Sequence, residues 1–599
     1  MKREAEDGCS ESADKLAKTM EEKEGGDHEA TFITPSTARP DRETELFDRQ
    51  LRLWESSGQQ LIQEAAVKIC DCCATSAQIA KNLILCGIKR IEMLDNKVVR
   101  QSEIGHNFFL EQSSLGQKRG KECCRLLDEL SSSKYAPTDW DDDLLDSGYF
   151  ESVDPSGLWT WQAHVCVRRP DKEEQVVSYW CWDQYVPTIL VQTCGLVASI
   201  RLQIRELSII QTHSESLVDL RLDCPFPSLS AFVNSFEMDK LDNHEHAHVP
   251  AVVIIIHFME MFKSQHDGKL PQDSAEREEL KRMILAEKRS ADEDNFDEAV
   301  GMIWKACQPT KVPAHVEELF NDPQCDKAAW WDGRFWMLVK SLREFVRRNA
   351  SHQLPLSGAL PDMKSDTQSY TKMQAIYRQQ ASEDLETFTK IMDEVQETLE
   401  EAVEKKLMED RSPSDSDPFY TNIGVGTDGP RFDVSSEMVA SFVKNAAHIR
   451  VVRGGQYGHH PRDLMLKFTN ECEPGNTEYT ATWYFAFEAL SSYRSMNDDE
   501  YPGMRKGQEE ADFNSLCAIV LEVLTKHGWD EKDKKVPEKL QKALKEMLRS
   551  AGCELPHIAS LVGGLVAQEI TKLVTHQYVP TNGICIFDGY QSSMGILEF

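Results

Sequence analysis

Residues 67–95 read VKICDCCATSAQIAKNLILCGIKRIEMLD, and this stretch decides the fold. The apolar run Val67–Asp71 predicts a buried strand, Ser76–Cys86 predicts an amphipathic helix that ends at Gly87, and Arg90–Asp95 predicts a second strand. A strand, a helix and a strand in this order form a β-α-β unit with a right-handed crossover. The first ordered part of the chain is therefore predicted to be α/β.

The same alternation continues to about residue 208. The pattern predicts a helix at Leu115–Leu130 and strands at Ala163–Val167, Thr188–Gln192 and Ser199–Glu206. Helices that alternate with buried strands are typical of a parallel, doubly wound sheet.

The C-terminal residues have the same buried character. HIASLVGGLVAQEITKLV (557–574) predicts an apolar helix, and GICIFD (583–588) and MGILEF (594–599) predict strands joined by the turn GYQSS. Elements of this type belong with the sheet of the first domain, so the chain between the two parts is predicted to be a large insertion.

The insertion is predicted to be mostly helical. Long charged, helix-favouring stretches lie at Ala275–Lys288, Phe335–Arg348 and Ala381–Leu407, and polar, Gly- and Pro-containing loops lie at Arg411–Pro418 and Thr421–Pro430. The expected organisation is a disordered acidic tail (1–42), the first part of the α/β domain (43–208), the helical insertion (209–525) and the last part of the α/β domain (526–599).

Composition excludes several classes of protein. The chain has 67 basic and 100 acidic side chains and a formal charge of −33, which repels nucleic acid. Its 17 cysteines lack the spaced framework of secreted domains, which indicates a reducing compartment. The apolar run Val249–Phe258 is about half a bilayer span, and the N-terminus has no apolar signal core. We expect a soluble cytoplasmic protein, with the nucleus as an alternative location, and no membrane insertion.

The turn between the first strand and its helix, Cys72–Ala77, contains no glycine. A dinucleotide or ATP site at such a junction needs glycines, because backbone N–H groups must approach the phosphates without a Cβ in the way. Asp95 ends the second strand about 20 residues after the turn, where a ribose-binding acid would lie. The alternative is an aspartate that ends a strand in a nucleotide-free fold.

Two patterns could indicate a metal site. Cys70, Cys72 and Cys73 are close in sequence, but the two-residue spacer and the second ligand pair of a zinc site are missing. The histidines of HEHAH (244–248) recur at every second residue, a pattern more typical of a solvated loop. We therefore expect no metal site.

A helix is predicted at Thr44–Ser56, before the first strand. Apolar side chains recur there at i, i+4 and i+7 from Phe47 to Trp54 and line one face. Arg49 and Arg52 share a different face.

Four segments together resemble the adenylating fold of the enzymes that activate ubiquitin-like modifiers. They are ELFDRQLRLW (45–54), KNLILCGIKRIEMLD (81–95), HIASLVGGLVAQEITKLV (557–574) and YVPTNGICIFDG (578–589). Two further segments, SLVDLRLDCPFPSL (216–229) and LPLSGALPDM (354–363), resemble the regulatory, non-catalytic subunits of the heterodimeric neddylation activating enzymes. The resemblance implies an α/β, doubly wound adenylating (Rossmann-like) fold interrupted by a large, mostly helical insertion.

Active members of this family are expected to surround one Mg-ATP with a glycine-rich turn, an Asp two positions after the ribose acid, an Asn-Arg-Gln segment and a helix-starting Lys. Here the turn lacks glycine, Lys97 replaces the Asp, and Gly105-His106-Asn107 replaces Asn-Arg-Gln. Gln117 replaces the Lys, although Lys118 and Arg119 beside it are basic. A lysine cannot hold magnesium, and a neutral histidine is a poor phosphate ligand. The resemblance therefore implies that this copy of the site binds no ATP.

The resemblance also implies where the reaction takes place. Active members carry a nucleophilic Cys followed by Thr, and none of the 17 cysteines here precedes Thr, so we expect no catalytic residue of its own. No cofactor is expected on this chain alone; Mg-ATP would bind at the site of the catalytic partner subunit. Arg49 would reach that ATP in trans, with Arg52 as a neighbouring contact. The alternative is that Arg49 pairs with a surface acid such as Glu45.

Two parts of the chain are predicted to contact the catalytic subunit. One is the sheet edge and loop after Gly87, with Asn96, Val98 and Arg100 as candidates. The other is an apolar stripe with helical spacing, because aromatic anchors are enriched in interfaces. The stripe consists of Phe335, Trp336, Leu338, Val339 and Leu342. Core packing is the alternative for this stripe.

The implied function is that of the regulatory subunit of a heterodimer. The heterodimer adenylates a ubiquitin-like modifier with ATP and passes it, through a thioester on a cysteine of the partner, to a conjugating enzyme. One alternative is the regulatory subunit of the small ubiquitin-like modifier system, which shares a motif like FDRQLRLW but lacks so long an insertion. The other is a self-sufficient nucleotide-dependent enzyme such as an oxidoreductase.

Overall fold

The computed structural model describes residues 42–130, 138–140, 162–169, 171–213, 218–327, 333–409, 434–529 and 535–599. The predicted tail, apart from residue 42, and the two predicted loops between residues 411 and 430 lie outside these ranges. The chain divides into two compact units, Met1–Leu53 and Trp54–Phe599. Of the first unit the structure describes the beginning of helix α2 (Arg42–Glu64).

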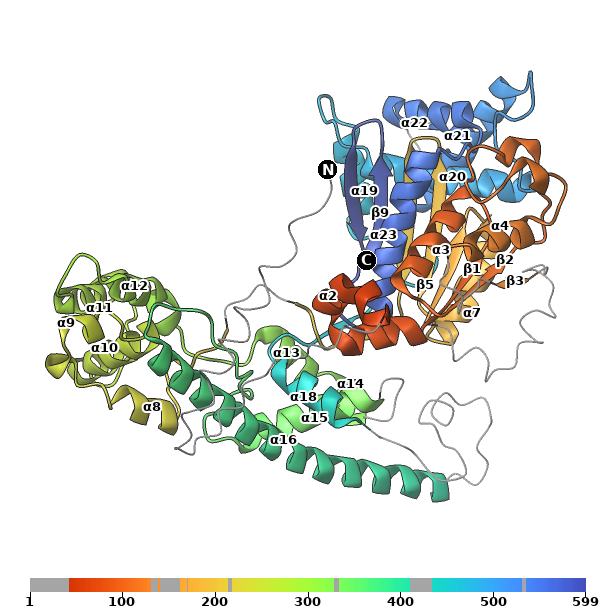
Figure 1. Ribbon diagram of the computed structural model, residues 1–599. Helices are drawn as coiled ribbons and strands as arrows, with labels where there is room; N and C mark the ends of the chain where they lie inside the picture. The colour runs from red at the N-terminus through yellow and green to blue at the C-terminus, as the bar shows by residue number, and fades with distance from the viewer. Residues whose placement is uncertain are drawn as a thin grey trace, which may run out of the picture. The chain divides into compact units, whose positions relative to one another are not determined.

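Among the described residues, eight strands form one sheet in the order β10-β9-β6-β5-β4-β1-β2-β3 (Figure 1). The strands are β1 (Ala66–Cys70), β2 (Arg90–Leu94), β3 (Thr138–Trp140), β4 (Ala163–Val167), β5 (Thr188–Cys194), β6 (Val197–Gln203), β9 (Gly583–Asp588) and β10 (Ser593–Glu598). Pairing of β9 with β6 confirms that the C-terminal strands complete the sheet of the N-terminal segment.

The sheet is mixed, whereas the sequence predicts a parallel one. Strands β1 to β5 pair in parallel, but β6, β9 and β10 pair antiparallel to their neighbours. The cause is a tight connection at Gly195 (φ 58°) between β5 and β6, which leaves no room for the crossover that a parallel neighbour requires. A separate antiparallel pair joins β7 (Leu207–Ile209) to β8 (Arg450–Val452).

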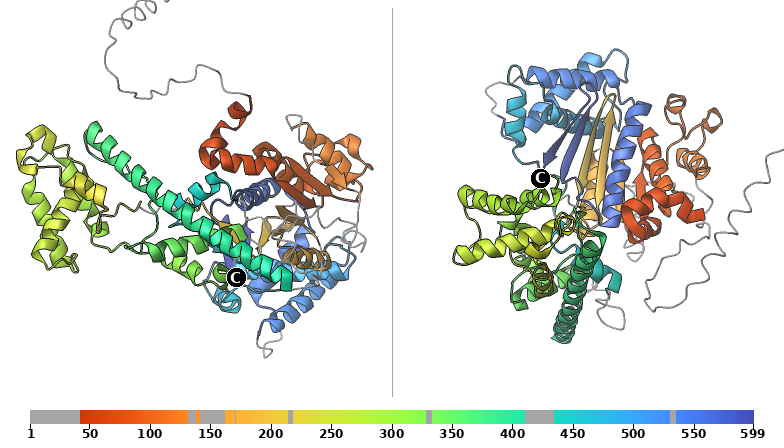
Figure 2. Two further views of the ribbon diagram at one scale, coloured as in Figure 1. Left: turned by 90° about the horizontal axis from the view of Figure 1, so that it is seen from below. Right: turned by 60° about the vertical axis from the view of Figure 1, so that its left-hand side comes forward.

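Helices cover both faces of the large sheet. On one face α3 (Ala74–Cys86) and α23 (Pro556–Thr575) lie side by side (Figure 1; Figure 2) and share an apolar cluster with Val67 and Ile69 of β1. On the other face Val177 and Cys181 of α7 (Asp171–Asp183) pack against Cys70. Helix α23 is long and apolar enough to cross a membrane, yet 61% of its most apolar stretch is buried inside the protein, as expected of a core helix.

Helices α2, α4 and α16 differ most from their predicted ranges. Helix α2 continues beyond Ser56 to Glu64, with a kink at Glu55 (φ 58°). Helix α4 (Arg119–Asp128) begins later than predicted, because Gly116 has a left-handed φ of 79° and short 3-10 turns at Gln101–Glu103 and Gln112–Ser114 precede the helix. Helix α16 (Thr367–Glu409) begins earlier than predicted, since the sequence between its ends contains no Gly or Pro to break it.

The helices between β7 and β8 form two apolar clusters of their own. Helix α16 joins them, because Tyr377 packs in one cluster and Phe388 in the other. The remaining helices are α8 (Pro227–Val233), the 3-10 turn Met238–Lys240, α9 (Asn243–His246), α10 (Ala251–Gln265), α11 (Ser274–Glu287), α12 (Asp294–Ala306), α13 (Ala314–Phe320), α14 (Pro323–Lys327), α15 (Gly333–Arg348) and α18 (Ser436–Lys444).

The last group of helices packs on the sheet. It comprises α19 (Leu464–Glu471), α20 (Thr480–Met496), α21 (Glu509–Lys526) and α22 (Glu538–Ser550). Trp483 and Leu490 of α20 share a cluster with Ile584 and Ile586 of β9. Helices on both sides of residue 526 thus contact the sheet; the predicted domain boundaries stay a prediction.

Candidate functional site

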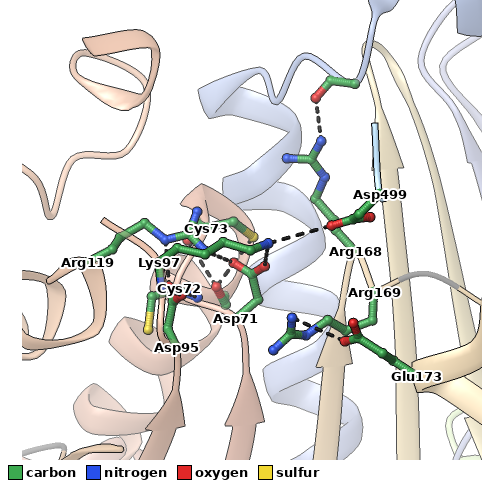
Figure 3. Close-up of polar contacts among 12 residues, drawn as sticks. Asp71, Cys72, Cys73, Asp95, Lys97, Arg119, Arg168, Arg169, Glu173 and Asp499 are labelled. Carbon is green, nitrogen blue, oxygen red and sulfur yellow. Dashed lines mark hydrogen bonds and ion pairs between the residues drawn. The ribbon is translucent and has the colours of Figure 1, made fainter. Parts of the chain in front are cut away.

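The turn that follows β1 lies at the carboxyl end of the parallel strands (Figure 3). In open α/β sheets, ligands bind at this end, between the two strands where the strand order reverses. In the order found here the reversal falls between β1 and β4. This turn and the residues around it are therefore the candidate site.

The turn keeps its shape without glycine. Asp71 has a positive φ of 84°, a conformation that aspartate adopts more readily than most residues, and its N–H donates to the carbonyl of Leu94 at 2.8 Å. Helix α3 then begins at Ala74, slightly earlier than predicted. Cys72 and Cys73 are 0% and 6% exposed, so their side chains fill the inside of the turn.

Arg119 lies at the centre of a buried ion-pair network (Figure 3). Its Nη2 is 2.6 Å from Asp71 Oδ1, its Nε is 2.5 Å from Asp95 Oδ2, and its Nη1 is 2.5 Å from Glu103 Oε1. The side chains of Arg119, Asp71 and Asp95 are 7%, 4% and 2% exposed. One guanidinium therefore joins the ends of β1 and β2 to the segment that follows β2.

Lys97 completes this network. Its Nζ lies 3.3 Å from Asp71 Oδ2 and 3.7 Å from Asp499 Oδ2. Its backbone N–H donates to Asp95 Oδ1 at 2.9 Å, while the N–H of Cys72 donates to Asp95 Oδ2 at 3.0 Å. Asp95, the predicted ribose acid, thus has both carboxylate oxygens engaged within the chain.

The network favours the charged forms of Asp71 and Lys97. Burial alone would raise the pKa of Asp71, but Arg119 and Lys97 outweigh burial and hold this pKa far below its usual range. Asp71 in turn raises the pKa of Lys97. Two cations thus lie among the carboxylates of Asp71, Asp95 and Glu103, and the chain supplies all of these charges itself.

A further carboxylate, that of Glu554, lies at the first turn of α3. Glu554 Oε1 accepts from Thr75 N at 3.0 Å and from Thr75 Oγ1 at 2.6 Å, and Oε2 accepts from Ala74 N at 3.1 Å. Arg168, directly after β4, places Nη1 3.0 Å from Oε2. Burial raises the pKa of Glu554, but Arg168 and the hydrogen bonds from Thr75 outweigh it and lower this pKa below its ordinary value.

Several of these residues were not predicted as part of a site. Asp71 and Arg168 directly follow buried strands, so the carboxyl ends of β1 and β4 were a signal that could have found them. In the sequence Arg119 is only a basic neighbour of Gln117, and nothing local indicates its three carboxylate partners. No local signal indicates Glu554, which lies 480 residues from Ala74 along the chain.

The other residues of the predicted nucleotide site lie around this network. Gln117 and Lys118 are exposed and His106 is half-buried. Lys118 Nζ lies 3.4 Å from the carbonyl oxygen of Asn96. Asn107 is buried, and its Nδ2 donates to the carbonyl of Cys72 at 3.3 Å.

The two thiols of the turn are held in their neutral form. A hydrogen bond with Cys123, together with burial, raises the pKa of Cys72 well above its usual value. Burial and the nearby Glu554 carboxylate do the same for the pKa of Cys73. A neutral, buried thiol is a poor nucleophile, so neither side chain suits thioester chemistry.

On the opposite face of the sheet, Cys70, His164 and Cys166 lie close enough together to hold a metal ion. Cys70 Sγ is 3.7 Å from His164 Nε2, whereas Cys166 Sγ is 3.8 Å from His164 Nδ1. The two sulfurs thus lie next to different ring nitrogens of His164. A single metal ion coordinates only one nitrogen of a histidine ring, so the two sulfurs do not share the ring nitrogen that would bind the ion. The expected lack of a metal site stays a prediction.

The middle histidine of 244–248 does not lie in a solvated loop. His246 is 0% exposed and its Nδ1 is 2.8 Å from Glu293 Oε1. The rings of His244 and His248 stack with centroids 4.4 Å apart. The short helix α9 buries His246, the middle histidine of the pattern, so the interpretation of this histidine as part of a solvated loop is wrong.

Arg49 and Arg52 are exposed on helix α2, in the unit Met1–Leu53. Arg52 pairs with Asp48 at 3.0 Å, one helical turn earlier. The guanidinium of Arg49 takes part in no ion pair within the part of the chain that the structure describes. The alternative pairing of Arg49 with Glu45 is therefore not found, and this arginine is open to solvent.

The two predicted partner surfaces differ in exposure. Asn96, Val98 and Arg100 are exposed along the segment after β2, while Gly87 is buried at the end of α3. The apolar stripe of α15 lies in the core of the chain instead, because its residues are at most 3% exposed; these are Phe335, Trp336, Leu338, Val339 and Leu342. The helical spacing of the stripe reflects core packing, so it offers no surface to a partner.

No family model matches the chain. Curated relatives, in contrast, match along nearly its whole length. The "NEDD8-activating enzyme E1 regulatory subunit" of Xenopus laevis is 28% identical over 556 residues, which are 90% of this chain and 96% of that protein. The regulatory subunit AXL of Arabidopsis thaliana is 29% identical over 91% of this chain and 97% of its own length. The chain is a homologue of these regulatory subunits.

The homology with NEDD8-activating regulatory subunits extends to Saccharomyces cerevisiae, where the protein of that name is 21% identical over 92% of this chain and 98% of its own length. The resemblance predicted from the sequence segments is thereby confirmed. Solved structures match less of the chain. Escherichia coli MccB in its crystal structure with ATP is 16% identical, with a TM-score of 0.24 and 26% of this chain covered.

Proposed function

We propose that this chain is the non-catalytic subunit of a heterodimeric NEDD8-activating enzyme. In this proposal the partner subunit binds Mg-ATP, adenylates the ubiquitin-like modifier and forms the thioester that passes to a conjugating enzyme. This chain binds no ATP itself and acts in the cytoplasm. The names of its relatives support the subunit assignment, since they are regulatory subunits of the same enzyme over nearly the full length.

One observation carries the proposal that this chain binds no nucleotide. Both oxygens of Asp95 are engaged by Arg119, Lys97 and the turn backbone, so this carboxylate has little capacity left for a ribose hydroxyl. Arg119 and Lys97 also pair with Asp71, and Lys97 stands at the position where the resemblance implies a magnesium-binding Asp. Binding of ATP would have to break a buried ion-pair network, which is strongly unfavourable.

The proposed contribution of this chain to the reaction is the guanidinium of Arg49. An exposed arginine that is in no ion pair among the described residues can be supplied to the phosphates of a neighbouring subunit without loss of a described contact. Such an arginine stabilises the charge that develops during phosphate chemistry. Arg52 is already paired with Asp48, so we assign it the lesser part.

The partner is proposed to cover the segment after β2. Asn96, Val98 and Arg100 point outward there, and Val98 is 47% exposed. Protein interfaces have an apolar core and a polar rim, and an exposed apolar side chain between two polar ones fits this arrangement.

The test measures ATP-pyrophosphate exchange with the modifier present. We expect none from this chain alone and exchange from the reconstituted pair. Arg49→Ala should lower the exchange rate of the pair by roughly a hundredfold or more, since an arginine supplied in trans is worth at least that much. Arg282→Ala, which removes another exposed helical arginine, is the matched control and should have no effect.

Full exchange by the Arg49→Ala pair would remove the in-trans role. Tight ATP binding by this chain alone, measured by calorimetry, would overturn the proposal as a whole. Size-exclusion chromatography of both variants with the catalytic subunit separates a loss of chemistry from a loss of assembly.

A further inference from the structure

The carboxylate of Glu554 occupies a position that suits an oxyanion. Helix α3 starts at Ala74, and its first backbone N–H groups lack partners within the helix. The N–H groups of Ala74 and Thr75 and the hydroxyl of Thr75 all donate to Glu554 instead, at 2.6 to 3.1 Å. The side chain of Glu554 is 5% exposed, so these bonds are shielded from water.

A guanidinium completes this set of donors. Arg168 Nη1 lies 3.0 Å from Glu554 Oε2, and its Nη2 donates to the carbonyl of Gly552 in the same loop. Its guanidinium carbon also lies 4.9 Å from the centre of the Tyr501 ring. Arg168 Nε is buried and has no hydrogen-bond partner among the residues that the structure describes, although the arginine lies directly beside the anion position.

These donors match those that bind a phosphate group. Two N–H groups at the start of a helix, one hydroxyl and one guanidinium are a typical phosphate-binding set. Their place in the fold also agrees, because α3 follows β1 and Arg168 follows β4, where the strand order reverses. The set therefore lies where a phosphate would bind in a nucleotide-binding sheet, yet it holds a carboxylate of the same chain.

A second glutamate shows that such a contact can be purely structural. Glu471 accepts from the N–H of Ala481, the N–H of Thr482 and the hydroxyl of Thr482, each at 2.8 Å, at the start of α20. Its carboxylate takes part in no ion pair among the described residues, and α20 does not follow a strand of the sheet. Glu471 thus reproduces the capping contacts of Glu554 without the arginine and without the position in the fold.

We propose that the first turn of α3, with Arg168, is an oxyanion-binding site that Glu554 fills, and that it binds inorganic phosphate once this carboxylate is removed. The inference rests on the proposed function, since it names the group that keeps phosphate out of this subunit. Glu554 acts here as an internal substitute for a phosphate, and the loop before α23 is held on α3 by the same bonds.

The experiment compares the full-length variants Glu554→Ala and Glu471→Ala with the unaltered chain. Each is titrated with inorganic phosphate by calorimetry, against sodium chloride of equal ionic strength. We expect Glu554→Ala to bind one phosphate with a dissociation constant of roughly 1 mM, a modest affinity because Asp71 adds a negative charge nearby. The unaltered chain and Glu471→Ala should bind none. The double variant Glu554→Ala, Arg168→Met should lose the phosphate binding.

If Glu554→Ala does not fold in chloride, the same comparison is made on refolding yield. Phosphate should then restore the yield of Glu554→Ala and leave that of Glu471→Ala unchanged. An equal response of the two variants to phosphate would overturn the inference, as would binding that persists without Arg168. Neither result bears on ATP binding by the unaltered chain, which tests the proposed function separately.

Discussion

At the scale of single residues, Arg119 is the side chain on which the candidate site depends most. Three carboxylates approach one buried guanidinium within 2.6 Å, and they come from three different segments. Desolvation of such charges is costly and is offset only while every carboxylate keeps its cation. The arrangement stabilises the native state only as a complete set.

Replacing Arg119 should therefore be far more damaging than replacing an exposed arginine of the same helix. Arg119→Met leaves Asp71 and Asp95 buried without their main cation, and we expect it to lower the free energy of unfolding by about 3–5 kcal/mol. Arg125→Met removes exposed ion pairs on α4 and should leave stability unchanged within error. Urea denaturation of both variants measures the difference, and equal midpoints would contradict the buried network.

At the scale of elements, the packing of α23 on α3 places the C-terminal segment on the first β-α-β unit. The contact is close because Gly563 faces α3: a Cβ at this position would lie 2.7 Å from the Cβ of Gln78 and 2.9 Å from its backbone carbon. The adjacent Gly564 has nothing within 4 Å and faces solvent. Two neighbouring glycines thus have different roles in one helix.

The adjacent glycines allow a matched test of this packing. Gly563→Ala should lower the free energy of unfolding by about 1–3 kcal/mol, because the backbone of α3 cannot move aside without loss of other contacts. Gly564→Ala should raise it by about 0.5–1 kcal/mol, since alanine favours a helix and meets no obstacle. Thermal unfolding of the two variants gives the signs. A stabilising effect of Gly563→Ala would show that the helices are less closely packed than described.

At the scale of the whole molecule, the large sheet is assembled from distant parts of the chain. Strands up to β6 end at Gln203, whereas β9, which pairs with β6, begins at Gly583. The helices between β7 and β8 form clusters of their own. Glu554, from the segment before α23, pairs instead with Arg168 at the carboxyl end of β4 and with the turn after β1. The segment after β2 remains exposed, which suits it to a partner subunit.

Disruption of that exposed segment should weaken assembly without unfolding the chain. Val98→Asp should raise the dissociation constant of the heterodimer roughly tenfold or more, because it places a charge in an apolar contact. Leu466→Asp, on a residue of α19 that is 61% exposed, is the control and should leave assembly unchanged. Binding of both variants to the catalytic subunit is measured by surface plasmon resonance. Unchanged affinity of Val98→Asp would place the interface elsewhere.

The sequence by itself determined the first β-α-β unit, the C-terminal helix and strands, and the resemblance to the regulatory subunits. Each of these follows from local signals: apolar periodicity, Gly87 after the helix, and segments such as ELFDRQLRLW. It also indicated that the turn lacks glycine. It misjudged the stripe at Phe335–Leu342, because an apolar helical stripe has the same spacing whether it faces a core or a partner.

Only the tertiary structure decided what fills the candidate site. The partners of Arg119 are 16 to 48 residues away, and Glu554 is about 480 residues from the turn that it caps. Such contacts depend on the order and direction of the strands, which a local pattern does not contain. The antiparallel strands β6, β9 and β10 arise in the same way, since pairing across the chain, and not the apolar pattern of each strand, sets their direction.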